Sequence, residues 1–379
     1  MKIVVNTRSL IPNKLDGIAW FTFQTLKRIT QAHPEIEFTF LFDRPYSEEF
    51  IFGSNVKPVV LFPPARHPFL YLLYYQIAVK NILQKIKPDL FLAPDGLLVI
   101  GARCKQLAVI HDINFEHYPN DLKFFYSKYY SIFVPVFARI ATRIASVSEF
   151  SKKDIATQYR IEPNKIDVVY NGINEGYRPL SEVEKTAVRA KYNKGLPYFL
   201  FVGSQSPRKN LARLIQAFDL FKKQSGANHQ LVLVGSSFWG KGEIDSSIQN
   251  SPYKADIIIT GRLAQEELEK ITASAFALTF VSYFEGFGIP LVEAMQCEVP
   301  IISSNVSCMP EIAGDAALYV DPFDSKDIAA KMLELFLNPS LAADLVRKGI
   351  ERKQKFSWDL SAEKLWQSIE KTIDAKASN

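Results

Sequence analysis

Short apolar runs rich in β-branched and aromatic residues recur along the chain, and longer segments, several with helical period, separate them. Runs of this length and composition are typical of strands that are buried on both faces. In the first half they are Ile3–Val5, Phe38–Phe42, Val59–Phe62, Leu90–Ala93, Leu107–Ile110, Ile144–Val147 and Asp167–Tyr170. In the second half they are Tyr198–Gly203, Gln230–Gly235, Asp256–Thr260, Phe276–Ser282, Ile301–Ser304 and Ala317–Val320. This alternation predicts an α/β protein whose parallel sheets are covered by helices on both faces.

A turn-rich segment, Asn171–Pro179, separates the two blocks of strands and breaks both periodicities. The 379 residues suffice for about two domains of about 150 to 200 residues. We therefore predict two Rossmann-like, doubly wound domains, residues 1–171 and 172–359. The amphipathic stretch after Trp358 predicts one more helix, about 360–379, which the second domain does not need.

Composition agrees with a folded protein, because 47% hydrophobic and 22% charged residues exclude disordered and fibrous classes. The longest stretch without Asp, Glu, Lys or Arg has 17 residues (224–240), fewer than the roughly 20 apolar residues of a membrane span. Three scattered cysteines form neither a disulfide framework nor a metal cluster. Because the first residues also lack an apolar signal core, we expect a cytoplasmic protein.

The positive net charge of +5 belongs to the first half of the chain. Residues 1–175 hold 21 lysines and arginines against 16 acids, whereas residues 176–379 hold 24 of each. This surplus is too small to indicate nucleic-acid binding. It favours an anionic surface or substrate instead.

The densest chemical motif is Phe284–Ala294, in which a predicted strand is followed by a glycine turn and a helix start. Gly286 and Gly288 permit unusual dihedrals, and Pro290 suits the beginning of a helix. Free backbone N–H groups and the positive end of the helix dipole would then lie at the carboxyl edge of a parallel sheet, where such folds bind anions and nucleotides.

Two glutamates flank this turn, Glu285 in the loop and Glu293 in the first turn of the expected helix. One carboxylate would accept hydrogen bonds from ribose hydroxyls, and the other would meet a sugar or a developing positive charge. The alternative is a surface turn with two solvated acids, which the coincidence of so many features disfavours.

A second turn of this kind, Phe201–Asn210, follows the first strand of the second domain. Gly203 ends that strand, and Arg208 and Lys209 lead into a helix. A basic pair is ordinarily a solvated surface feature. At the end of a strand, after a glycine, it indicates neutralisation of a diphosphate.

The first domain offers weaker signals. Gly17 follows the opening strand without a G-x-G-x-x-G pattern, so a dinucleotide fingerprint is absent, although its backbone can still approach a phosphate. His111 and Asp112 end a strand, and a lone histidine there is either structural or part of a site. The other histidines have no metal-ligand spacing with neighbouring acids or cysteines.

These motifs resemble the retaining glycosyltransferases of family 4, also called group 1, which have the two-domain GT-B architecture with a cleft between the domains. Glu285 and Glu293 match the family's paired glutamates, with seven residues between them, and Gly203 with Arg208–Asn210 matches its phosphate-binding turn. The resemblance covers nearly the whole chain. Supporting matches are Gly17, His111–Asp112, Val147–Ser151, Asn171–Ile173, Gly261–Leu263 and Phe356–Trp358.

The resemblance implies a role for each matched residue. Glu293 would hold the nucleotide ribose, Arg208 and Lys209 the diphosphate, and Leu263 would lie near the base. Glu285 and the backbone of Phe287, Gly288 and Ile289 would contact the donor sugar. His111 would lie beside the transferred sugar and Gly17 near the donor phosphate, although Asp16 stands where the family often has a second glycine. The last helix would return to the first domain.

The function implied is transfer of a hexose, with mannose as the first guess, from a nucleoside-diphosphate sugar such as GDP-mannose to a saccharide or lipid-linked saccharide, with retention at the anomeric carbon. No Asp-x-Asp motif occurs, so we expect no metal and no cofactor. Two alternatives remain open. One is another GT-B enzyme, such as a nucleotide-sugar epimerase or a sugar-phosphate synthase. The other is a non-catalytic nucleotide-sugar-binding scaffold.

The first half of the chain, which carries the positive net charge, also contains an aromatic and basic stretch, Phe124–Arg143. On a helix it would place rings at the headgroup level of an anionic membrane, giving a peripheral contact at the inner face. The alternative is that most of these rings are core residues of a buried helix.

Overall fold

The computed structural model describes residues 1–236 and 242–375, which fold into two compact units. Unit 1 comprises Met1–Gly172 with Ser357–Asn379, and unit 2 comprises Ile173–Phe356. The strand pattern predicts the boundary after residue 171, and the amphipathic stretch after Trp358 predicts a last helix from about residue 360. Residues 376–379 of that predicted final segment lie outside the described residues.

Unit 1 is built on a parallel sheet that has seven strands in the described part of the chain, in the order β3-β2-β1-β4-β5-β6-β7. Its central strands are buried on both faces, as the continuous apolar runs predict. The order reverses direction between β1 and β4, so the loops after these two strands flank the switch point. The strands are β1 Lys2–Asn6, β2 Glu37–Phe42, β3 Val56–Val60, β4 Leu90–Ala93, β5 Lys105–Ile110, β6 Arg143–Ser146 and β7 Ile166–Val168.

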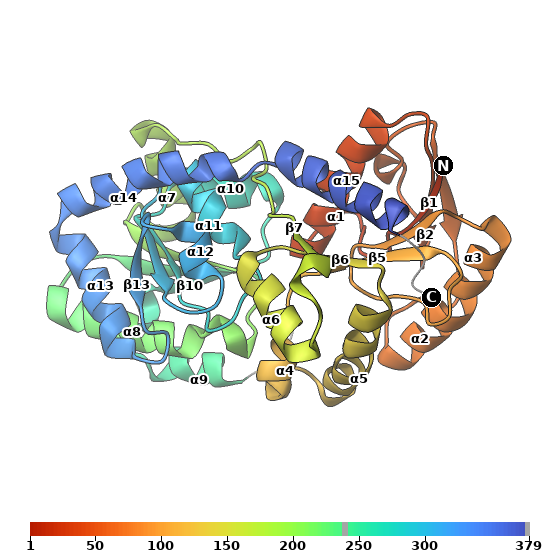
Figure 1. The fold of residues 1–379 in the computed structure, drawn as a ribbon. Helices are drawn as coiled ribbons and strands as arrows, with labels where there is room; N and C mark the ends of the chain where they lie inside the picture. The colour runs from red at the N-terminus through yellow and green to blue at the C-terminus, as the bar shows by residue number, and fades with distance from the viewer. Residues whose placement is uncertain (237–241, 376–379) are drawn as a thin grey trace. The chain divides into compact units, whose positions relative to one another are not determined.

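Helices cover this sheet (Figure 1). The helix α1 begins because the Asp16 side chain caps it, accepting from the backbone N–H of Ala19 at 3.0 Å. A short π-helical segment, Tyr74–Val79, joins α2 to α3. The helices are α1 Gly17–Ala32, α2 Pro68–Leu73, α3 Lys80–Ile86, α4 Asn114–His117, α5 Phe124–Ile140, α6 Glu149–Tyr159 and α15 Trp358–Asp374.

The last helix, α15, packs beside α1 and against β5 and β6, although it follows unit 2 in the chain (Figure 1). Ser357 caps it by accepting from the N–H of Leu360 at 3.1 Å. A Cβ on Gly172 would lie 2.2 Å from the backbone nitrogen of Trp358, so only glycine permits this close crossing. The final helix therefore belongs to the first unit.

Unit 2 repeats the architecture with six parallel strands among its described residues, in the order β10-β9-β8-β11-β12-β13. The order reverses between β8 and β11, and the two glycine turns predicted from the sequence follow these two strands. The strands are β8 Tyr198–Val202, β9 Gln230–Val234, β10 Ile257–Gly261, β11 Ala277–Phe280, β12 Ile301–Ser304 and β13 Ala317–Val320.

The helices of unit 2 are α7 Glu182–Asn193, α8 Leu211–Ser225, α9 Glu243–Asn250, α10 Gln265–Ala273, α11 Ile289–Gln296, α12 Met309–Ala313, α13 Ser325–Leu337 and α14 Pro339–Arg352. The first of them, α7, starts with a capping box in which Ser181 and Glu184 satisfy each other's backbone N–H groups. Two parallel sheets with helices confirm the predicted fold class.

The strand that differs most from its prediction is β3. The run Val59–Phe62 reads as a strand, but β3 is Val56–Val60, and Phe62 is 82% exposed beyond its end. The edge strand β3 pairs only with β2 in the described sheet, so its apolar residues are less enclosed than those of the centre.

Candidate functional site

The site begins with a close approach of two backbone turns in unit 2. Gly203, directly after β8, has φ of +152°, and a Cβ on Gly235, which follows β9, would lie 1.9 Å from the carbonyl oxygen of Gly203. A Cβ on Gly203 would itself meet the Lys209 side chain at 3.4 Å. The glycine thus lets Lys209 lie directly against the end of the strand.

Asn210 connects the loops that follow three strands. It adopts a left-handed conformation (φ 64°) before α8. Its Nδ2 donates to the carbonyl oxygens of Val281 at 3.0 Å and Pro322 at 2.6 Å. The backbone N–H of Tyr283 donates in turn to the carbonyl oxygen of Arg208 at 3.0 Å. The basic turn is therefore held against the loop that carries Glu285.

Arg208, Lys209 and Glu285 form a buried cluster. The Nζ of Lys209 lies 2.5 Å from Oε1 of Glu285, and Nη1 of Arg208 lies 2.6 Å from Oε2. Glu285 and Lys209 are 6% and 7% exposed. Burial alone would raise the pKa of the Glu285 carboxyl, but the two cations outweigh it and lower the pKa to about 2.

Neutral groups complete the surroundings of the two cations. Nη1 of Arg208 also donates to the carbonyl oxygen of Phe284 at 3.0 Å, and Nζ of Lys209 lies 4.9 Å from the centre of the Phe280 ring. Two cations held at a sheet edge can bind a diphosphate, which carries more negative charge than a carboxylate.

Ser307 is a site residue that the sequence analysis missed. Its hydroxyl donates to the carbonyl oxygen of Glu285 at 2.6 Å and accepts from the N–H of Glu285 at 3.1 Å. Both bonds involve the main chain of Glu285, so they hold its Cα while leaving the carboxylate to other partners. Ser307 is 22 residues from Glu285 along the chain, and no local sequence pattern predicts the contact.

The helix α11 follows the glycine turn as predicted. Gly288 precedes it with φ of +84°, and Phe287 is buried against Phe356, with ring centroids 5.6 Å apart. Ile289 begins the helix and is half-buried. The amino-terminal end of α11 therefore lies at the carboxyl edge of the sheet, beside the loop of Glu285. Pro290 has no N–H, and the N–H of Leu291 donates to the carbonyl oxygen of Gly288 at 2.9 Å, so the first donor at this end is the N–H of Ile289.

Glu293 lies deeper than its expected position. Because α11 begins at Ile289, Glu293 is the fifth helical residue and starts the second turn, not the first. It is 7% exposed. Burial raises the pKa of its carboxyl to about 7, with the Tyr177 hydroxyl opposing and the Glu269 carboxylate adding to the shift. Leu263 lies between the end of β10 and the start of α10 and is half-buried.

In unit 1, His111 follows β5, and its ring Nε2 lies 2.9 Å from the carbonyl oxygen of Pro94, which follows β4. The ring packs edge-on against Phe21 of α1, with centroids 5.2 Å apart. Burial lowers the pKa of His111, so the ring is neutral at pH 7. Since a carbonyl oxygen can only accept, Nε2 carries the proton and Nδ1 keeps its lone pair for a hydroxyl donor.

Gly17 is the first residue of α1 and is exposed. Its neighbour Asp16, which departs from the family's glycine, is the N-cap of that helix. Gly17 and His111 belong to unit 1, whereas the other candidate residues belong to unit 2.

A further cluster in unit 1 was also missed. It lies at the switch point, where Arg8 follows β1 and Asp95 follows β4. Nε of Arg8 lies 2.6 Å from Oδ2 of Asp95 and 3.0 Å from the hydroxyl of Tyr75, which donates to Asp95 at 2.7 Å. The three residues are far apart in sequence and belong to no motif.

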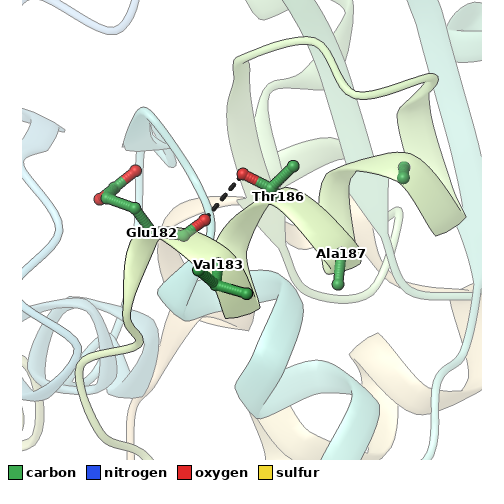
Figure 2. Close-up of a pocket in the computed structure, with 5 residues that line it drawn as sticks. Glu182, Val183, Thr186 and Ala187 are labelled. Carbon is green, nitrogen blue, oxygen red and sulfur yellow. Dashed lines mark hydrogen bonds between the residues drawn. The ribbon is translucent and has the colours of Figure 1, made fainter.

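A shallow surface depression along α7 contains none of the candidate residues. Its lining consists of Glu182, Val183, Thr186, Ala187 and Ala190, and the Thr186 hydroxyl donates to the carbonyl oxygen of Glu182 at 2.7 Å (Figure 2). Val183 is 81% exposed. The lining has no cation that could bind a diphosphate, so this depression does not match the predicted site.

The described residues contain neither a metal-binding cluster nor a membrane-spanning helix. No group of three or more His, Cys, Asp or Glu side chains in residues 1–236 and 242–375 is arranged to hold a metal ion. Over the same residues, no helix combines the length and the apolar character needed to cross a bilayer.

Two family models match consecutive parts of the chain. The model described as Glycosyltransferase Family 4 matches residues 16–177, and the model described as Glycosyl transferases group 1 matches residues 183–352. The two matched regions correspond closely to the two halves that the strand pattern predicts.

Curated relatives include O-antigen chain mannosyltransferase B of Escherichia coli, 31% identical over 220 residues, and O-antigen chain mannosyltransferase RfbU of Salmonella typhimurium, 29% identical over 221 residues. Each match covers 58% of this chain and 58% of the relative. The chain thus matches a little more than half the length of these relatives.

Solved structures share the fold at low identity. Anabaena HepE in complex with UDP and glucose has a TM-score of 0.77 at 17% identity, covering 98% of this chain and 99% of that one. WaaG, a glycosyltransferase involved in lipopolysaccharide biosynthesis, has a TM-score of 0.76 at 15% identity, covering 99% and 100%. On its motifs, its two sheets and these matches, the chain belongs to the group 1 glycosyltransferases of the GT-B fold.

Proposed function

We propose that the protein is a retaining hexosyltransferase that moves a hexose from a nucleoside-diphosphate sugar to a saccharide or lipid-linked saccharide acceptor. The observation that carries this proposal is the buried cluster of Arg208, Lys209 and Glu285 beside the start of α11. Cations and a helix N-terminus at a sheet edge suit a diphosphate leaving group. Relatives named mannosyltransferases support mannose, and hence GDP-mannose, as the first donor to test.

In this reaction an acceptor hydroxyl oxygen forms a bond to the anomeric carbon while the bond from that carbon to the diphosphate oxygen breaks. The hydroxyl proton passes to the leaving phosphate. Arg208, Lys209 and the positive dipole end of α11 stabilise the charge on the departing diphosphate. Glu293 accepts hydrogen bonds from the ribose, and Nδ1 of His111 accepts one from a hydroxyl of the transferred sugar.

The experiment is a panel of GDP- and UDP-sugars, tested first by thermal shift and then by transfer to saccharide acceptors. A ligand that binds only the folded state raises its stability with the logarithm of ligand concentration over Kd. Transfer with an unchanged anomeric configuration, read by NMR of the product, supports the proposal. Inversion contradicts retention. Epimerised donor or a sugar phosphate as product favours another GT-B enzyme, and binding without turnover favours a scaffold.

A membrane-presented acceptor is part of the proposal, and the surface of unit 1 supports it. Phe124 and Phe125, at the start of α5, are 66% and 65% exposed, and Phe69 on α2 is 63% exposed. Lys123 and Lys128 are also exposed beside them. Exposed rings beside cations suit the headgroup region of an anionic membrane.

The rest of α5 agrees with the alternative interpretation, in which the rings of this stretch are core residues of a buried helix. Tyr129 and Phe137 are buried in the core of unit 1, and Tyr126 donates from its hydroxyl to the carbonyl oxygen of Arg66 at 2.9 Å. Only the beginning of the helix, together with the neighbouring α2 residues, therefore enters the proposed membrane contact.

Flotation with vesicles that contain anionic lipid tests this contact. We expect binding at low salt that falls steeply as salt rises, since exposed charges are screened beyond about 10 Å at 0.1 M. Phe124→Ser with Phe125→Ser abolishes flotation, whereas Val183→Ser, at an exposed apolar residue of unit 2, leaves it unchanged. A wild-type protein that stays at the bottom at both salt concentrations contradicts the membrane contact.

A further inference from the structure

The two cations assigned to the diphosphate already hold an anion of this chain. Glu285 contacts Lys209 through Oε1 and Arg208 through Oε2, at 2.5 and 2.6 Å, so each carboxylate oxygen faces one cation. The arrangement places two acceptor oxygens where two oxygens of a diphosphate would have to lie. A carboxylate and a diphosphate therefore cannot both make these contacts.

We propose that the Glu285 carboxylate is a placeholder for the diphosphate of the donor. It occupies the two cations when no nucleotide is bound and turns to the sugar when the donor enters. After transfer it returns to the cations and promotes release of the nucleoside diphosphate. This inference rests on the proposed function, because it takes Arg208 and Lys209 as the diphosphate-binding groups.

The physical need for a placeholder comes from burial. Lys209 is 7% exposed, and the Arg208 side chain is 21% exposed. Cations removed from water are costly unless a charged partner compensates them. Glu285 is a carboxylate that both share, so its contacts compensate both charges.

The exchange requires no movement of the backbone. Ser307 holds the N–H and the carbonyl oxygen of Glu285, and the Phe284 carbonyl oxygen is tied to Arg208. The glutamate side chain can rotate about its own bonds while its Cα stays in place. Its carboxylate can thus leave the cations and reach a neighbouring ligand.

The consequence is a difference between substrate and product. With a nucleotide sugar bound, the displaced carboxylate gains sugar hydroxyls as partners. With a nucleoside diphosphate bound, those hydroxyls are absent, and the carboxylate competes with the diphosphate for the same two cations. Glu285 therefore weakens the binding of product more than the binding of donor.

Isothermal titration of GDP, UDP and inorganic pyrophosphate into the full chain tests the inference. We expect Glu285→Gln, which removes the competing charge and keeps the shape, to lower the Kd for the nucleoside diphosphate about tenfold. A decrease of that size corresponds to about 1.4 kcal/mol. The Kd for pyrophosphate, which lacks base, ribose and sugar, should also decrease in Glu285→Gln. Glu298→Gln, at an exposed acid after α11, is the matched control and should change neither Kd.

A second variant covers the case in which Glu285→Gln does not fold. Glu285→Asp keeps the charge but is one methylene too short to reach both cations, so it should bind the nucleoside diphosphate more tightly than the wild type and less tightly than Glu285→Gln. In steady-state assays the same order should appear as stronger product inhibition.

The outcomes separate the two proposals. If the wild type binds GDP or UDP but neither variant binds it more tightly, the placeholder role is wrong and the proposed function stands. If the wild type binds no nucleoside diphosphate and no nucleotide sugar, the proposed function fails and the placeholder falls with it. Tighter binding of product by both variants, with unchanged binding by Glu298→Gln, supports the inference.

Discussion

Glu285 and Glu293 are both buried in unit 2, eight positions apart, and the pKa values of their carboxyl groups are shifted in opposite directions. Burial would raise both pKa values. Two cations reverse that effect at Glu285 and lower its pKa to about 2, whereas at Glu293 burial dominates and raises the pKa to about 7. Near neutral pH Glu285 stays ionised, while Glu293 changes its charge.

Donor binding should therefore depend on pH through Glu293. Below about pH 7 its carboxyl is protonated in the free protein and is a poorer acceptor for ribose hydroxyls. We expect the affinity for the nucleotide sugar to rise between pH 6 and pH 8, as measured by titration calorimetry. Glu293→Gln should bind more weakly and lose most of this pH dependence. An equally steep profile in the variant would show that another group titrates.

The basic pair should be indispensable for diphosphate binding. Arg208→Ala and Lys209→Ala each remove a charged hydrogen-bond donor, which costs about 1.5 to 3 kcal/mol, and the double variant should show no transfer. Lys223→Ala, at an exposed lysine of α8, is the control and should transfer at the wild-type rate.

Activity should also survive EDTA, because the cationic pair and the start of α11 supply the charge that a metal would otherwise provide. The measurement is the transfer rate before and after chelation. Activity that disappears in EDTA and returns with magnesium or manganese would contradict metal independence.

Substitution of His111 should lower the rate of transfer without changing the affinity for the nucleoside diphosphate. Its neutral ring donates from Nε2 to the Pro94 carbonyl oxygen and keeps the Nδ1 lone pair for a sugar hydroxyl. We expect His111→Ala to lower kcat up to about 10-fold, because one neutral hydrogen bond is worth about 0.5 to 1.5 kcal/mol. His111→Asn, whose amide can both donate and accept, should recover part of the rate. The Kd for the nucleoside diphosphate should equal that of the wild type in both variants, and a change there would place His111 elsewhere in the site.

A buried histidine away from the glycine turns should control stability at acid pH. His229 is 7% exposed and packs among the rings of Phe199, Phe221, Phe276 and Phe336. Neither ring nitrogen has a hydrogen-bond partner in the described part of the chain. Burial, reinforced by Lys222 and Arg189, lowers its pKa from 6.5 to about 4. The unfolded chain therefore binds more protons between these values, and stability falls as the pH drops from about 6.5 to about 4.

His229→Phe should remove this acid sensitivity, because a phenylalanine neither binds a proton nor leaves buried nitrogens without partners. We expect a gain of about 1 to 3 kcal/mol in the free energy of unfolding of unit 2, larger at pH 5 than at pH 8. Urea titrations at the two pH values measure it. A gain of equal size at both would show that protonation plays no part.

The architecture and the family could be read from the sequence because both depend on patterns local to the chain. Continuous apolar runs predict strands buried in parallel sheets, and glycines beside them mark the turns at which a backbone must approach another group closely. The spacing of Glu285 and Glu293 and the turn from Gly203 to Lys209 needed no knowledge of the fold. Even the helix after Trp358 was visible as an amphipathic period.

Only the tertiary structure decided which groups meet across long separations in sequence. Ser307 holds the backbone of Glu285, and Asn210 ties together the loops after β8, β11 and β13, through pairings that no periodicity encodes. The pairing of Glu285 with Arg208 and Lys209, 77 and 76 residues away, depends on strands β8 and β11 being neighbours in the sheet. The pKa of a site residue depends on its burial and on every charge and hydrogen bond near it, and these surroundings form only when the chain has folded.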